Sequence, residues 1–542
     1  MTRRPAPDAR FPMRSCLLAA LVAGALSLTL PVLAANTPSH TPASAGVAWQ
    51  LAAGDADIDR AFAQAKLEKK PLLLYWGAKW CPPCNQLKAT LFNRADFINR
   101  SKSFVAVNID GDLPGAQKLG GRFKVRGYPT MILMRADGTE ITRLPGEADA
   151  PQVMRVLQLG LAGGRPVKAV LADALAGKPV SGNEWRSLAY YGWDIDEAQL
   201  VSEAERPGLL AQLSRACPPG EREAAMRLLL KALAGSDEGK GIKPDAALQE
   251  RVRSLLADAA ATRAQMDVVV NYASEISKAL APEPGAERLA LAGAFDAALQ
   301  RLEADASLSR ADRLSALASR VALARIDMAK NERHPPLPSA LVQRVKAQVA
   351  RDDREISDGY ERQAVVTAGA HLLGEAGQWA EAESLLKANL ARSHSPYYLM
   401  SQLGSQARKL GRKDEALRWY EQAFDKSEGP ATRLQWGAGY FSALVELAPQ
   451  EGPRIERVAR QLFAEAAKDA AAFHERSARS LQRVGSKLAE WNKDGQHDAV
   501  LRRLAEGQDG QPGLAAVCAK LPSADGQRAT CEGIAKGLLN KA

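Results

Sequence analysis

The sequence predicts two parts, a mixed α/β domain followed by a larger all-α region. Up to about residue 164, apolar runs that suit buried strands, such as "PLLLYWGA" from Pro71, alternate with segments of helical periodicity. Beyond that point no strand-like alternation persists, and helical stretches are separated by breakers such as "CPPGE" and "RHPPLPS". Alanine is abundant and aromatic residues make up only 6% of the chain, which favours helices over a large sheet.

Size and composition fit a globular protein with more than one domain. The chain has 542 residues, of which 46% are hydrophobic and 25% are charged. The formal net charge is +10, but the 72 basic and 62 acidic residues are interspersed without runs of one sign. This pattern predicts a mixed, solvated surface, so we expect no nucleic-acid partner.

The first 35 residues predict an export signal. Four arginines precede the apolar stretch "CLLAALVAGALSLTL", and "PVLAAN" then offers small residues for cleavage after Ala34 or Ala35. An uncleaved anchor is the alternative, because the stretch is near the lower length limit for spanning a bilayer. Residues 36–46 are polar and predict a linker. We therefore expect a soluble mature protein in the periplasm.

The elements of the α/β domain, residues 47–164, follow from local patterns. Ile58, Ala61 and Ala65 recur at helical spacing, and Asp137-Gly138 suits a hairpin turn. The predicted order is a helix that ends before Lys69, a strand from Pro71, a helix from near Cys81, a strand over 103–110, a helix, a hairpin that begins at 131–135, and a helix over 150–161.

Three separated motifs carry a resemblance to a known fold. "WCPPC" lies at a strand-to-helix junction, "RGYPT" precedes a strand, and "DGTEITRLPG" follows it. On these motifs, residues 47–164 resemble a thioredoxin-fold domain. A lone C-x-x-C would be weak evidence, because this spacing also suits zinc. The resemblance covers less than a quarter of the chain.

The two cysteines of "WCPPC" are the candidate redox pair. Cys81 is predicted at a helix N-terminus, where free backbone N–H groups and the helix dipole favour a thiolate. We expect an exposed Cys81 to be the nucleophile and the more buried Cys84 to resolve the mixed disulfide. Trp80 is expected to shield the site. The resemblance implies a cis peptide bond at Pro129 and binding of the substrate backbone at Tyr128.

Other interpretations of this pair are less well supported by the sequence. A zinc site needs further Cys or His ligands, and none of the six histidines lies in the folded part of the first domain, so we expect no metal. A permanent structural disulfide is the other alternative. Tyr75 stands where many thioredoxins have a buried aspartate, which leaves the reduction potential open. No cofactor is expected, because the cysteine pair itself carries the electrons.

The remaining cysteines outside the signal predict one structural bridge. Cys518 and Cys531 bracket a short segment near the C-terminus, and we expect a disulfide between them in an oxidising compartment. Cys217 is left over. It is interpreted as a lone buried thiol, with pairing to a distant cysteine as the alternative.

The all-α region contains an internal repeat. Gly377 aligns with Gly411 and Pro396 with Pro430, each pair separated by 34 residues, which resembles two tetratricopeptide units. We therefore divide the region into irregular helices over 165–360, tetratricopeptide-like repeats over 361–470 and C-terminal helices over 471–542. Two groups of aromatic residues are interpreted as interdomain or core packing, with a recognition surface as the alternative: Trp185, Tyr190, Tyr191 and Trp193, and Trp379, Trp419, Tyr420 and Phe424.

These observations predict an exported thiol–disulfide oxidoreductase that acts on protein thiols and disulfides. "WCPPC" resembles exported reductive members of the thioredoxin-like family, so a reductase or isomerase is favoured, and reduction there would need an electron donor in the membrane. The helical body is expected to recruit a protein partner. A non-catalytic binding scaffold and an oxidising member of the same family are the alternatives.

Overall fold

The computed structural model describes residues 46–146, 148–236, 242, 244–329, 331–508, 510–524 and 526–539. The predicted export signal, residues 1–35, lies outside these residues, as does the predicted linker apart from its last residue. A search of the described helices for one both long and apolar enough to span a bilayer finds no candidate. The described residues belong to one compact unit.

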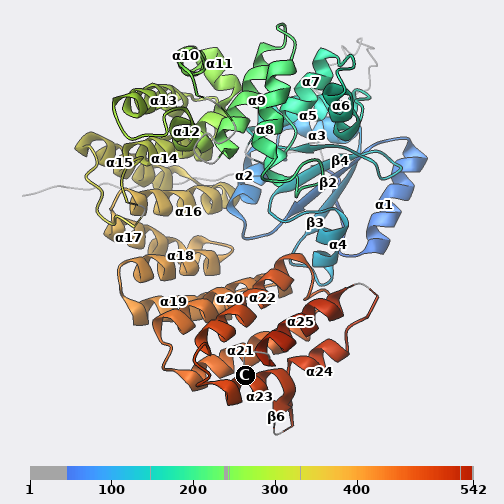
Figure 1. Cartoon of the computed structure of the whole chain (residues 1–542), viewed down its shortest axis with the longest axis vertical. Coiled ribbons are helices and arrows are strands. Elements are labelled where there is room, and N and C mark those ends of the chain that lie inside the picture. The colour runs from blue at the N-terminus through green and yellow to red at the C-terminus, as the bar shows by residue number, and fades with distance from the viewer. Residues whose placement is uncertain are drawn as a thin grey trace, which may run out of the picture. The chain divides into compact units, whose positions relative to one another are not determined.

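A five-stranded mixed sheet organises the N-terminal part (Figure 1), with the strand order β1-β3-β2-β4-β5. The central strand β2 runs parallel to β3, with Leu74 opposite Val107, and antiparallel to β4, with Leu74 opposite Ile132. All six residues of β2 are buried, as expected for a strand covered on both faces. The strands are β1 (Gln50–Leu51), β2 (Leu72–Gly77), β3 (Val105–Asp110), β4 (Thr130–Met134) and β5 (Glu140–Leu144).

Helices cover both faces of this sheet. One face packs with α1 and α4, and the other packs with α2, α3 and α5. The alternation of side chains along β2 divides these two cores, because Leu74 faces the first and Leu73 the second. The helices are α1 (Asp55–Glu68), α2 (Pro82–Thr90), α3 (Ala95–Ser101), α4 (Ala116–Arg122) and α5 (Ala150–Leu161).

The predicted fold class is confirmed, an α/β domain followed by a large helical region. The sequence analysis did not predict β1 or α3, which are too short to show a clear period. The predicted hairpin forms, with Gly138 at φ 89° in its turn, a backbone conformation that glycine adopts without strain.

The rest of the chain is almost entirely helical. A short hairpin, β6 (Gly507–Gln508) and β7 (Gln511–Pro512), interrupts it near the C-terminus. The helical elements are α6 (Val167–Leu175), α7 (Gly182–Ala189), η1 (Trp193–Ile195), α8 (Arg206–Ala216), α9 (Arg222–Gly235), α10 (Ala246–Ala257), α11 (Ala259–Ala264), α12 (Met266–Leu280), α13 (Ala286–Ala304), α14 (Arg310–Ala324), α15 (Ser339–Glu355), α16 (Gly359–Glu375), α17 (Trp379–Asn389), η2 (Leu390–Arg392), α18 (Pro396–Lys409), α19 (Lys413–Lys426), α20 (Pro430–Leu447), α21 (Gly452–Ala466), α22 (Glu475–Trp491), α23 (Asp498–Glu506), α24 (Leu514–Ala519) and α25 (Gln527–Leu539).

The predicted 34-residue repeat falls on two consecutive helix pairs. Helices α16 and α17 pack together, and so do α18 and α19. Gly377 and Gly411 occupy the turns within these pairs, at φ 74° and 78°. Their tetratricopeptide character and the domain boundaries within the helical region stay predictions.

The apolar core joins the sheet to the first helices of the helical region. Residues on α2 and α5 share one buried cluster with α6 to α9 and α12 to α13. Two further cores lie elsewhere, one on α14 to α18 and one on α19 to α25. Figure 1 shows the corresponding neighbours, with α16 beside α2 and α22 beside α4. Most apolar residues of the C-terminal helices thus lie in their own core, while Tyr397, Ala423 and Trp436 also pack with the core of the sheet.

A buried ion pair between α9 and α12 lies beside the α/β domain, which contacts it through Gln152 of α5. Arg227 Nη1 donates to Asp267 Oδ1 at 2.9 Å, and both side chains are essentially inaccessible to solvent. Gln152 of α5 donates to the same carboxylate at 3.0 Å. The carboxylate of Asp267 therefore links helices of both parts of the chain.

We expect Asp267→Ala to lower the free energy of unfolding by about 3–5 kcal/mol, because it leaves the Arg227 charge buried and unpaired. Urea unfolding followed by circular dichroism measures the loss. Asp55→Ala is the matched control, since Asp55 pairs with Arg122 on the surface and its removal should cost about 1 kcal/mol or less. Equal losses in the two variants would contradict this account of the junction.

Candidate redox site

The cysteine pair lies where strand β2 passes into helix α2. Cys81 is the residue directly before α2, and its Sγ accepts a hydrogen bond from the backbone N–H of Cys84 at 3.2 Å. Cys81 and Cys84 form a disulfide with an S–S distance of 2.34 Å. Pro82 and Pro83 occupy the first helical positions, where a missing N–H has no cost. The local geometry therefore places one sulfur at a helix N-terminus, where a negative charge is favoured.

The loop before β4 contains the second feature of the site. The peptide bond between Tyr128 and Pro129 is cis. The Tyr128 hydroxyl accepts a hydrogen bond from Gln117 Nε2 at 3.0 Å, and its ring centroid lies 5.9 Å from that of Trp80. The structure thus brings together Trp80, Cys81 and the Tyr128–Pro129 loop, which the sequence separates by almost fifty residues.

The expectation that Cys81 is exposed is wrong for this structure. Cys81 is only 2% exposed and Cys84 is fully buried. Trp80 is 7% exposed, so it is itself covered, and its predicted shielding of the pair stays a prediction. The physical reason is the packing of the helical region against the start of α2, a contact that no local sequence pattern predicts.

Six side chains of the helical region close over the segment from Lys79 to Cys81. They come from α16, α18, α20, α22 and the turn before α18. We call them the helical cover: Gln363, His394, Tyr398, Thr432, Trp436 and Arg476.

Trp80 makes most of the contacts with the helical cover. Its ring stacks on Tyr398 with centroids 5.8 Å apart, and meets Trp436 edge to face at 5.6 Å. Its Nε1 donates to Thr432 Oγ1 at 2.6 Å and to Asp112 Oδ2 at 3.1 Å. At the rim, Lys79 Nζ pairs with Glu428 at 3.0 Å, and both side chains are well exposed. Aromatic contacts and a few hydrogen bonds therefore hold the closed arrangement.

Asp112 is a buried acid at the edge of this site. Burial raises the pKa of its carboxyl to about 6, hydrogen bonds from Thr432 and Trp80 oppose the rise, and the charge of Asp110 adds to it. The sequence analysis missed Asp112. The only sequence signal for Asp112 was its position, as an acidic residue in the loop directly after the strand predicted over 103–110.

Tyr75 does not replace the aspartate that many thioredoxins carry at this place. Its hydroxyl is buried and has no hydrogen-bond partner among the described residues. Burial and the charge of Asp110 raise the pKa of Tyr75 well above its usual range. The phenol therefore stays protonated and accepts no proton from the cysteine pair at neutral pH.

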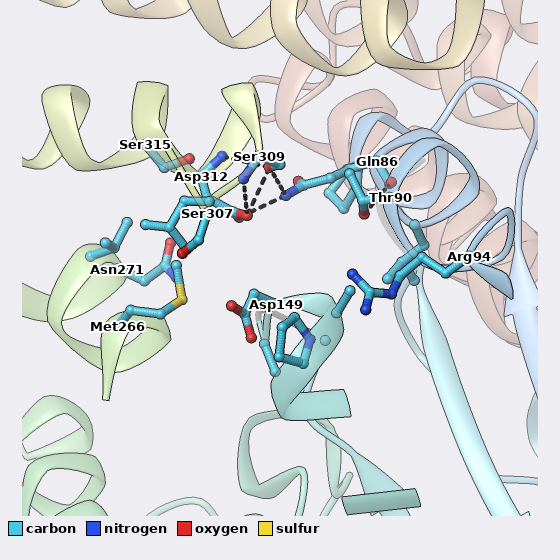
Figure 2. Close-up of a pocket in the computed structure, with 18 residues that line it drawn as sticks. Gln86, Thr90, Arg94, Asp149, Met266, Asn271, Ser307, Ser309, Asp312 and Ser315 are labelled. Carbon is cyan, nitrogen blue, oxygen red and sulfur yellow. Dashed lines mark hydrogen bonds between the residues drawn. The ribbon is translucent and has the colours of Figure 1, made fainter. Parts of the chain in front are cut away.

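A pocket of about 460 Å³ lies beside α2 (Figure 2). It is lined by Pro83, Gln86 and Thr90 on one side and by residues of α12 and α14 on the other, but by neither cysteine. Gln86 Nε2 donates to Asp312 Oδ1 at 2.7 Å across it, as Figure 2 shows. The pocket therefore leaves the disulfide covered, and its polar contacts join α2 to α14.

The three other described cysteines are all buried. Cys518 and Cys531 are joined by a disulfide with an S–S distance of 1.98 Å, and both are buried in the core of α19 to α25. Cys217 is a free, buried thiol whose pKa is raised to about 11 by burial and by the nearby charge of Glu221. Across the described part of the chain, no three His, Cys, Asp or Glu side chains are grouped so that they could hold a metal ion.

Comparison with known proteins agrees with this geometry. Residues 58–160 match the family model of the thioredoxin-like domain. Similar curated proteins include thiol:disulfide interchange protein DsbD 2 of Pseudomonas aeruginosa, 32% identical over 126 residues, which are 22% of this chain and 22% of that protein. Disulfide bond reductase DsbH of Chlamydia pneumoniae is 26% identical over 144 residues, which are 22% of this chain and 81% of DsbH.

A plant protein matches the same part of the chain. Thioredoxin H2 of Arabidopsis thaliana is 31% identical over 103 residues, which are 19% of this chain and 66% of that protein. The chain spans only about a fifth of the length of the DsbD proteins it matches. The likeness therefore concerns the N-terminal domain, and residues 58–160 form a thioredoxin-like domain that this chain joins to a large helical region.

Proposed function

We propose that this chain is a periplasmic thiol–disulfide oxidoreductase that acts on protein cysteines through Cys81 and Cys84. The observation that carries the proposal is the disulfide at the start of α2, close to the cis Tyr128–Pro129 bond, in a thioredoxin-like domain. The names of the relatives, thiol:disulfide interchange protein and disulfide bond reductase, support the same chemistry. The periplasmic location rests on the export-signal pattern of residues 1–35.

The favoured direction is reduction or isomerisation of a partner disulfide. The Cys81 thiolate attacks one partner sulfur, forms a mixed disulfide and releases the other partner sulfur as a thiolate. The Cys84 thiolate then attacks Cys81 Sγ, which closes the Cys81–Cys84 disulfide and releases the second partner thiolate. Two electrons pass to the partner, and a dithiol donor in the membrane must restore the reduced pair. Tyr128 and Pro129 bind the extended chain of the partner, and Trp80 flanks it.

This reaction requires the helical cover to move away from Trp80. A partner sulfur must approach Cys81 directly, and a residue that is 2% exposed offers no such approach. Opening would separate Trp436 of α20 from the core of the sheet, while most other apolar residues of α20 and α22 stay in a core of their own. The helical region then has two roles, covering the pair and recruiting a protein partner.

A binding scaffold is the second candidate, and the burial of both cysteines favours it. In that case the Cys81–Cys84 disulfide is a permanent bridge, and the helical repeats alone bind the partner. The two candidates differ in whether the pair is reduced and reoxidised in the native protein. The following experiments separate them.

We expect Cys84→Ser to accumulate mixed disulfides with natural partners, because serine cannot attack the bond at Cys81. The variant is made in a Cys217→Ser background to remove the other free thiol. Non-reducing electrophoresis and mass spectrometry identify the adducts after isolation from the periplasm. Cys81→Ser in the same background is the matched control, and it should trap none and lose insulin-reductase activity. If wild type reduces no insulin and neither variant forms adducts, the scaffold is correct.

We expect Trp436→Ala to increase the rate at which a phosphine reduces the Cys81–Cys84 disulfide. The change removes an edge-to-face contact worth about 1 kcal/mol from the closed state, so the rate should rise about fivefold. Quenched samples labelled with an alkylating mass tag report the reduced fraction over time. Trp491→Ala is the matched control, because Trp491 packs near the C-terminus against His497. Equal rates in wild type and Trp436→Ala would show that the cover does not limit access.

We expect access to the disulfide to increase with pH through Asp112. The pKa of this carboxyl is about 6 when closed and returns towards 3.8 on opening. Protonation therefore favours the closed state, and ionisation between about pH 4 and 6 favours the open state. Asp110, Arg476, Tyr128 and Tyr397 are the other titratable groups that act on it.

Asp112→Asn tests this dependence, because it does not ionise and keeps an acceptor oxygen for one of the two donors, Trp80 and Thr432, which bond to different oxygens of Asp112. The ratio of wild-type to Asp112→Asn phosphine reduction rates cancels the pH dependence of the reagent. This ratio should rise between pH 4 and 7, by up to about a hundredfold for a difference of about two pKa units. A ratio that is constant with pH would rule out Asp112 as the titrating group.

A further inference from the structure

We propose that Arg476, from the helical region, is a positioning residue of the redox pair, whose charge stabilises the thiolate of Cys81 in the closed state. The proposal rests on the proposed function, because it matters only if Cys81 becomes a thiolate. It makes the helical region part of the redox site as well as its cover. Three observations support this role: the contacts of Arg476, its charge without an ion-pair partner, and the negative charge that reduction places on Cys81.

The contacts of Arg476 place it against both halves of the redox site. Its guanidinium carbon lies 4.3 Å from the ring centroid of Tyr128 and 5.5 Å from that of Trp80. These two residues directly precede Pro129 and Cys81 in the sequence. The cation therefore bridges the cis-proline loop and the residue before the nucleophile, at distances typical of cation–π contacts.

The position of Arg476 is fixed from both sides. Its backbone N–H donates to Gln117 Oε1 at 3.1 Å, and Gln117 in turn donates to the Tyr128 hydroxyl. Its Nη1 donates to Gln435 of α20. An arginine held by the first turn of one helix and by a neighbouring helix presents its charge at a defined place.

The side chain of Arg476 is only partly exposed, and its charge is not balanced by an ion pair. Among the residues that the structure describes, no carboxylate lies within ion-pair distance of it. Burial lowers the pKa of its guanidinium, and the neighbouring Arg479 adds to the lowering, while Tyr128 and Asp112 oppose it. Arginine nevertheless stays protonated in proteins. A partly buried cation without an anionic partner has a cost, which is offset when a negative charge forms nearby.

Reduction of the pair supplies that negative charge. A partner dithiol gives two electrons to the Cys81–Cys84 disulfide and becomes a disulfide itself; one of its protons goes to Cys84, which becomes a thiol, the other goes to solvent, and Cys81 is left as a thiolate. The helix N-terminus stabilises this thiolate through the N–H of Cys84. Arg476 adds a full charge in a partly buried region, where electrostatic effects are stronger than in bulk water. It therefore favours the reduced pair.

The test compares Arg476→Gln with wild type in the full chain. Arg476→Gln should raise the pKa of Cys81 by about one unit, at the lower end of the effect of a nearby opposite charge. The ultraviolet absorbance of the thiolate against pH gives this value in the Cys84→Ser, Cys217→Ser background without requiring access to the sulfur. The equilibrium constant for reduction by glutathione should fall about tenfold, which corresponds to a potential about 30 mV more negative.

Three further variants make the result specific. Arg476→Lys keeps the charge and should restore most of both values. Arg476→Met fills the space between the two rings without a charge, and should behave as Arg476→Gln if that variant folds poorly. Arg479→Gln is the matched control, because Arg479 lies one turn along α22, pairs with Glu475 and is partly exposed. It should leave the pKa of Cys81 and the potential unchanged.

The outcomes separate this inference from the proposed function. If wild type cycles its disulfide but both uncharged variants leave the Cys81 pKa and the glutathione equilibrium unchanged, the role of Arg476 is wrong and the oxidoreductase stands. If Arg479→Gln shifts the values as much as Arg476→Gln, the effect is a general one of surface charge and the inference is also wrong. If wild type neither reduces insulin nor traps partners, the proposed function itself fails.

Discussion

The packing of the Trp80 indole between the thioredoxin-like domain and the helical region is the contact on which the redox site depends. It joins the residue before Cys81 to Tyr398, Thr432 and Trp436, and through them to α18 and α20. The same ring lies under the guanidinium of Arg476. One side chain therefore connects access to the disulfide with the electrostatic environment of its first sulfur, so a change in one is expected to change the other.

The two ends of the helical region are attached to the α/β domain in different ways. The first helices share its apolar core, and Gln152 of α5 donates to Asp267 of the buried Arg227–Asp267 pair on α9 and α12. The last helices meet it through aromatic rings, a few hydrogen bonds and an exposed ion pair at Lys79, contacts that are individually weak. The first attachment suits a permanent joint, and the second suits a surface that separates and closes again without unfolding either part.

The sequence predicted what depends on local patterns. The strand before Cys81, the helix after it and the hairpin at Gly138 each have a period or a turn signal of their own. The helical cover has none, because Thr432 lies 352 residues from its hydrogen-bond partner Trp80. In the sequence, nothing distinguishes Trp436 from an aromatic residue of a helical core, and nothing distinguishes Arg476 from the other charged residues. Contacts over such separations depend on how whole helices stack, which no short pattern records.

The burial of the Cys518–Cys531 disulfide bears on how easily it can be reduced. If the chain reduces disulfides as proposed, an accessible bridge of its own would be a substrate for neighbouring copies of the same molecule. Both of its sulfur-bearing residues are almost completely enclosed by the packing of the C-terminal helices. Under the proposed function, this enclosure would slow attack by a thiolate on the C-terminal bridge, which would stay oxidised while the Cys81–Cys84 pair exchanges electrons.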